Sequence, residues 1–159
     1  MRTQFLCLLA LVTLLGGCKK SVSGGGSNAA NSWTFGGKSF KAASVVYASS
    51  GGVGQLTATA AGATASSGDG LIFTFYIAPT SNVQLLITDT QTPGTAVVAT
   101  AHLSGSAITG YLNKQTTVKA NITVAGGKVS ASFPGTIWLY NSTNANDSLP
   151  LTVGTISQN

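Results

Sequence analysis

The chain contains no glutamate, and its only arginine is Arg2. Charged residues make up only 7% of the sequence. Helices on protein surfaces usually carry spaced pairs of Glu, Lys and Arg, so this scarcity argues against a helical protein. Nucleic-acid binding normally needs clustered Lys and Arg among aromatic residues. From residue 31 onward the chain has five scattered lysines and three aspartates, which gives a net charge of +2. This excludes nucleic acid as a partner.

Groups for catalysis and metal binding are equally scarce. There is one histidine, His102, and the three aspartates, Asp69, Asp89 and Asp147, lie twenty or more residues apart. A hydrolytic triad needs a base with an orienting acid, and a zinc site needs three or four ligands. The sequence therefore predicts no enzyme, no metal site and no cofactor. Two alternatives stay open: a hydrolase built on His102 with one aspartate, and calcium held by Asp69 or Asp147 with backbone carbonyls.

Cysteine occurs twice, and both copies lie near the start of the chain, at Cys7 and Cys18. Met1 and Arg2 precede an apolar run from Phe5 to Leu15, which is typical of a secretory signal peptide. As a helix this run would rise roughly 16 Å, about half the thickness that a transmembrane helix must cross. We expect the run to be removed rather than to span a membrane.

The end of this leader, Leu15-Gly16-Gly17-Cys18, resembles a bacterial lipobox. The resemblance implies cleavage before Cys18, which would carry lipid on its sulfur and on its amine and anchor the protein to a membrane. Cys7 would leave with the leader, so the mature chain would hold no disulfide. The sequence thus predicts a signal peptide over 1–17, a lipidated cysteine with a flexible Gly/Ser tether over 18–31, and one domain over 32–159.

The domain is rich in Thr, Ser, Gly, Ala and Val, a balance typical of β-sheets with one face in water. Paired glycines at Gly36-Gly37 and Gly126-Gly127 separate alternating segments and predict two-residue hairpins. The alternating run 71–78 is the expected central strand, and 135–140 and 151–157 are the expected last strands. The spacing predicts roughly nine or ten short strands in an antiparallel sandwich or barrel. We favour the β-sandwich, because nothing in the pattern demands closure.

Aromatic residues offer one possible binding surface. Alternation places Trp138 and Tyr140 on the face opposite Ile137 and Leu139, so one of these faces should belong to the core. Exposed Trp and Tyr rings could stack on a sugar, as in carbohydrate-binding β-sandwiches. The alternative is that these two rings pack in the core or in a dimer interface.

Taken together, the lipobox, Lys19-Lys20, the tether and the domain's opening Trp-Thr-Phe-Gly-Gly-Lys-Ser-Phe (33–40) resemble the small lipoproteins of Bacteroidota. The resemblance implies an outer-membrane lipoprotein with a β-sandwich domain and no assigned activity. It also implies an O-glycosylation acceptor motif at Asp147-Ser148-Leu149, with Ser148 as the acceptor. Acidic surface-export signals are replaced here by two lysines, which leaves the periplasmic and surface faces of the membrane both open.

These observations favour a membrane-anchored, non-enzymatic binding or scaffold module of the cell envelope. Its partners would be the membrane, through the lipid on Cys18, and a glycan or an envelope protein. The alternative is a glycan-binding accessory lipoprotein that uses Trp138 and Tyr140. The third hypothesis is the hydrolase based on His102.

Overall fold

A computed structural model of the protein describes residues 29–60, 69–104 and 107–159, without the side chains of 101–109. The leader, Cys18 and most of the tether lie outside the described residues. The described ranges contain no helix that could cross a membrane. They form twelve strands: β1 (Ser32–Phe35), β2 (Lys38–Ser50), β3 (Val53–Ala60), β4 (Asp69–Phe75), β5 (Val83–Ile87), β6 (Thr95–Ser104), β7 (Ala107–Asn113), β8 (Lys119–Ala125), β9 (Lys128–Ser132), β10 (Thr136–Asn141), β11 (Ser148–Val153) and β12 (Ile156–Ser157).

Eight of these strands close into a barrel. They follow the order β6-β4-β3-β2-β1-β11-β10-β7, and β7 pairs back onto β6. The all-β class and the antiparallel pairing are confirmed, and among the described pairs only β5 and β6 run parallel. The expected sandwich of nine or ten strands is wrong. The physical reason is β7, which the sequence pattern missed and which joins the two open edges.

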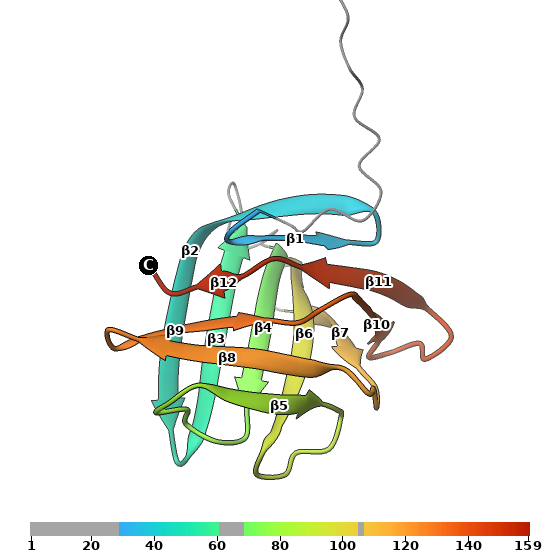
Figure 1. Ribbon diagram of the computed structural model, residues 1–159. Helices are drawn as coiled ribbons and strands as arrows, with labels where there is room; N and C mark the ends of the chain where they lie inside the picture. Colours follow the sequence, from blue (N-terminus) through green and yellow to red (C-terminus); the bar gives the residue numbers. More distant parts are fainter. Residues whose placement is uncertain (1–28, 61–68, 105–106) are drawn as a thin grey trace, which may run out of the picture.

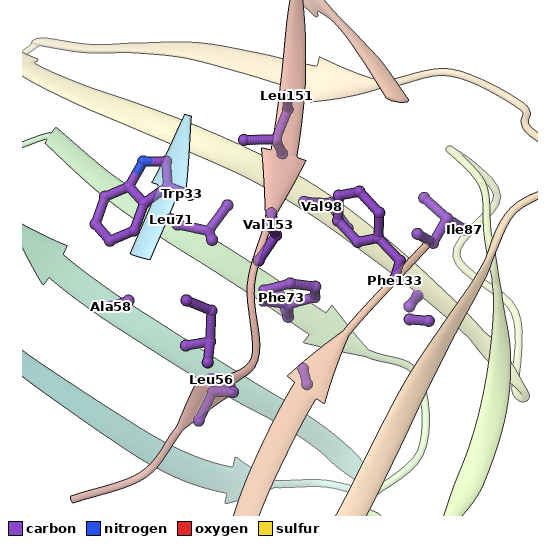
Figure 2. Packing of buried hydrophobic residues seen from close by; sticks show 14 of the residues in the cluster. Trp33, Leu56, Ala58, Leu71, Phe73, Ile87, Val98, Phe133, Leu151 and Val153 are labelled. Atoms are coloured by element: carbon purple, nitrogen blue, oxygen red, sulfur yellow. The ribbon is translucent and has the colours of Figure 1, made fainter. Parts of the chain in front are cut away.

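The remaining strands, β5-β8-β9-β12, form an arm attached to one end of β6 through β5. Figure 1 shows the arm crossing in front of β3, β4 and β6, so these strands bury their inner faces against it. Phe73 of β4 lies at the centre of this contact, with its ring 6.2 Å from that of Phe133, which follows β9. Figure 2 shows the barrel and the arm sharing this one hydrophobic core.

Alternation along β4 follows the sequence prediction. Leu71, Phe73 and Phe75 are fully buried on one face, whereas Ile72 and Thr74 on the other are half-buried. β4 ends at Phe75, so the last part of the expected strand 71–78 lies beyond it. The hydrophobic period of two is therefore the feature that sets which face of β4 enters the core.

Paired glycines make the tight turns, as predicted. Gly36 and Gly37 take φ of 55° and 81°, the left-handed values that a two-residue hairpin needs at both positions. Gly126-Gly127 does the same between β8 and β9, and a third pair, Gly51-Gly52, joins β2 to β3. Because a two-residue turn fixes the register, each pair also decides which residues of its two strands face each other.

At Val98 the edge of β6 changes partner. β7 pairs with β6 from Ala99 onward, whereas β5 pairs with its other end at Thr95 and Ala96. The Val98 N–H between them is satisfied by the Oδ1 of Asn113, over 2.6 Å, and Asn113 is itself buried. A side-chain amide thus replaces the ladder hydrogen bond at the point where barrel and arm separate.

The expected last strand, 151–157, is in fact two strands, β11 and β12, and β11 begins at Ser148. It therefore contains Pro150. The Pro150 carbonyl accepts a hydrogen bond from Gly36 N, over 3.0 Å, so its nitrogen also points to the side where β1 has ended. Proline is tolerated in β11 because the missing N–H has no strand partner there.

Candidate functional site

The first hairpin carries four side chains that face one end of the barrel. The register sets Trp33 opposite Phe40 and Phe35 opposite Lys38, and all four lie on the inner face. Trp33 and Phe40 stack, with ring centroids 5.5 Å apart and planes 19° from parallel. Trp33 is only 1% exposed and forms the floor, whereas Lys38 is exposed at the rim. The hairpin therefore supplies one aromatic wall ending in a cation.

The opposite wall comes from β4, β6 and β7. The register aligns Leu71, Thr100 and Tyr111 across these three strands, and Thr100 is 7% exposed. The Tyr111 ring meets that of Phe35 edge to face at 5.1 Å, which joins the two walls. Asp69, at the start of β4, adds a carboxylate to this side.

Between the walls lies a cavity of about 340 Å³. This volume lies in the range of small-molecule sites, which are mostly apolar with a few placed polar groups. Eight-stranded barrels can hold one small ligand inside in this way. The cavity lies at the end of the barrel where β4 begins, because Asp69 and Gly70, the first two residues of β4, line it. Its lining residues are Trp33, Phe35, Gly36, Lys38, Phe40, Asp69, Gly70, Thr100, Tyr111 and Leu149.

Tyr111 is held in the cavity wall by a hydrogen-bond network. Its hydroxyl donates to the Oδ2 of Asp147 over 2.6 Å, and the amide of Asn141 donates to the same oxygen over 3.1 Å. The bond from Tyr111, helped by that from Asn141, lowers the pKa of Asp147. The same bond to the carboxylate raises the pKa of Tyr111. The network fixes the ring that bridges the two walls.

Trp138 and Tyr140 lie on the outer face of β10, opposite the buried Ile137 and Leu139, as predicted. Trp138 is 51% exposed, so it does not pack in the core of the protein. Tyr140 is different, because the Nζ of Lys114 lies 4.0 Å from the centre of its ring. One face of Tyr140 is therefore occupied by a cation, and Trp138 is the ring that offers a stacking surface.

The other predicted site residues are dispersed. Ser148 is half-buried at the start of β11, and the adjacent Asp147 is tied to Tyr111. The backbone register sets Asp69 opposite His102, whose side chain lies outside the described residues, as does Cys18. Asp89 lies after β5 and accepts a hydrogen bond from Thr88. Among the described residues, no three His, Cys, Asp or Glu side chains gather in a group that could hold a metal ion.

Sequence reasoning missed the cavity, although part of its signal was present. A two-residue Gly-Gly turn fixes the register of Trp-Thr-Phe-Gly-Gly-Lys-Ser-Phe, and that register alone places Trp33, Phe35, Lys38 and Phe40 on one face. The opposite wall carried no such signal, because it depends on the long-range pairing of β4, β6 and β7. Comparisons of the chain with protein-family models, with curated proteins and with solved structures find no match.

Proposed function

We propose that this protein is a lipid-anchored, non-enzymatic binding protein of the bacterial cell envelope, and that the mouth of its barrel holds a small, mainly apolar ligand. The observation that carries the proposal is the cavity of about 340 Å³ between Trp33, Phe35, Phe40, Tyr111 and Leu149. Aromatic walls with few polar groups favour ligands whose apolar body leaves water on binding.

The anchor is the second part of the proposal. The lipobox-like Leu15-Gly16-Gly17-Cys18 supports acylation of Cys18 and attachment to the outer membrane. About 13 tether residues would reach roughly 20 Å as a flexible chain. Because this tether enters the domain beside Trp33, the cavity would stay close to the membrane surface.

The two tryptophans allow a direct test of the cavity, because Trp33 forms its floor and Trp138 lies outside the barrel. In the full chain carrying Cys18→Ser and Trp138→Phe, Trp33 is the fluorescent reporter. We expect 1-octanol, which does not absorb in this range, to change the intensity of Trp33 emission with saturation, because the bound ligand would contact a ring that lines the cavity. The matched Trp33→Phe protein, which reports through Trp138, should show no such change.

Leu149→Phe serves as the blocking variant, since the larger side chain takes up part of the cavity. It should weaken octanol binding while near-ultraviolet circular dichroism stays that of a folded protein. If octanol leaves Trp33 emission unchanged in the folded protein, the cavity does not bind apolar ligands and the proposal is wrong.

For the anchor, we expect Cys18→Ser to move the protein from the membrane fraction to the soluble fraction, because the thiol that would carry the lipid is gone. Lys19→Ser, which changes the neighbouring residue and keeps the thiol, is the control and should stay with the membrane. Unchanged fractionation of the Cys18→Ser protein would contradict lipidation.

A second candidate function is glycan binding on the outer face of β10, and the exposure of Trp138 favours it. Lys114 covers Tyr140, so the stacking ring would be Trp138 alone. Affinity electrophoresis with soluble xylan and hydroxyethylcellulose tests this version. Retardation should be lost in Trp138→Ala and kept in Tyr140→Ala, and equal loss in both variants would argue against stacking on Trp138.

A further inference from the structure

We propose that the ligand of the barrel mouth is an anionic amphiphile, with its apolar body between the aromatic walls and its carboxylate, or a similar anion, at Lys38. This inference rests on the proposed binding function and specifies the chemical class of the ligand. Its basis is the position of a single cation at the rim of an otherwise aromatic and apolar wall.

The backbone directs Lys38 toward the cavity. Lys38 is two residues from Phe40 and faces Phe35 across the hairpin, so its side chain lies on the inner face with both rings. Of the five lysines in the described chain, Lys38 is the one that lines the cavity. Lys41 also lies on β2, where it pairs with Ser32. Alternation along the strand directs its side chain to the outer face, and it is exposed.

Asp69 is the negative group on the other side of the cavity, and its place makes the site asymmetric. β3 lies between β2 and β4, and Thr59 on β3 pairs with Ser44 on one side and with Gly70 on the other, so Asp69 lies two strands away from Lys38 and several residues further along the sheet. Asp69 is already engaged in an interaction of its own. An anionic head is thus attracted to the Lys38 side and repelled from the Asp69 side, which orients the ligand.

The remaining polar groups do not compete for this anion. The Tyr111 hydroxyl already donates its hydrogen bond to Asp147, which is not among the residues that line the cavity. Thr100 is nearly buried between Leu71 and Tyr111, deep in the wall. A deep apolar region with one cation at the rim matches a molecule with a hydrocarbon body and a terminal anion.

The test compares octanoate with octanamide, which have the same length but different charge, through Trp33 emission in the full chain with Cys18→Ser and Trp138→Phe. Octanoate should bind about fivefold more tightly, as expected for a partly exposed charge pair of about 1 kcal/mol. Lys38→Met should remove this preference, so that octanoate binds no more tightly than octanamide. Lys41→Met, with the same loss of charge on the same strand, should keep the preference.

The outcomes separate this inference from the binding function. Equal binding of octanoate and octanamide, unchanged by Lys38→Met, would overturn the inference and leave the apolar cavity intact. An equal effect of Lys38→Met and Lys41→Met would also overturn it, because the preference would then come from net charge. If neither compound nor octanol changes Trp33 emission, the binding function itself falls.

Discussion

At the scale of single residues, the hydrogen bond between Tyr111 and Asp147 couples the wall of the cavity to pH. The bond favours ionised Asp147 and protonated Tyr111, so the pKa of Asp147 lies below 3.8 and that of Tyr111 above 10.0. Because the pKa of Asp147 is depressed, its ionised carboxylate stabilises the folded state. This contribution is complete above about pH 4 and is lost as the pH falls through the pKa of the folded state. Because the pKa of Tyr111 is raised, its protonated hydroxyl also stabilises the folded state. This contribution is complete below about pH 10 and is lost as the pH rises through the pKa of the folded state.

We therefore expect Tyr111→Phe to raise the pKa of Asp147 toward 3.8, and Asp147→Asn to lower the pKa of Tyr111 toward 10.0. Carbon-13 NMR titration of the carboxyl and ring carbons measures both. Asp89→Asn, which changes a carboxylate in the connection after β5, is the control and should leave the Tyr111 titration in place. A Tyr111 titration that is the same in Asp147→Asn as in the unmodified protein would contradict the hydrogen bond.

At the scale of elements, the sequence predicted what depends on near neighbours. The alternation of 71–75 and the Gly-Gly turns were predicted because period and turn chemistry are local. β7 was missed, since its seven residues contain Gly110 and give little alternation. Its place is determined by β6 and β10 on its two sides, which are pairings that a local pattern does not report.

The point where β5 and β7 share one edge of β6 gives a prediction at this scale. Asn113→Ala leaves the buried Val98 N–H without its acceptor, and an unsatisfied buried donor costs about 1–3 kcal/mol. We expect the free energy of unfolding, measured by urea denaturation, to fall by that amount.

The matched control for this prediction is Asn121→Ala, which removes an exposed amide that accepts a hydrogen bond from Gln84 on β5. Its cost should stay within about 0.5 kcal/mol. Equal losses of stability in the two variants would mean that Asn113 contributes no more than a surface amide, and that the junction has another support.

At the scale of the whole molecule, periodicity assigns residues to faces but does not say whether a sheet closes. The same alternating strands suit a sandwich or a barrel, and the choice depends on whether the edges meet. Half of the cavity could have been predicted from the first hairpin, whereas the other half needed closure to bring Thr100 and Tyr111 opposite Trp33. The sequence did not reveal the cavity because, like the closure of the barrel, it depends on pairing between strands that are far apart in the chain.

Phe73 tests whether the barrel and the arm behave as one folding unit. It is fully buried on β4, and its ring lies 6.3 Å from Phe75 in the barrel and 6.2 Å from Phe133 beside the arm (Figure 2). Phe73→Ala removes a ring from the core that both parts share, and such truncations cost about 3–5 kcal/mol. We expect one cooperative urea transition shifted to lower concentration, with the slope unchanged.

Val46→Ala is the control for this prediction, because Val46 is 59% exposed on β2 and its truncation should change stability by less than about 0.5 kcal/mol. With Trp138→Phe in the background of each variant, Trp33 fluorescence reports the barrel mouth, and far-ultraviolet circular dichroism reports all strands. Coincidence of the two curves in Phe73→Ala means that the mouth unfolds together with the shared core. If the Trp33 curve keeps its original midpoint while the dichroism curve moves, the barrel mouth is stable without the arm, and the single core does not set the stability of the binding cavity.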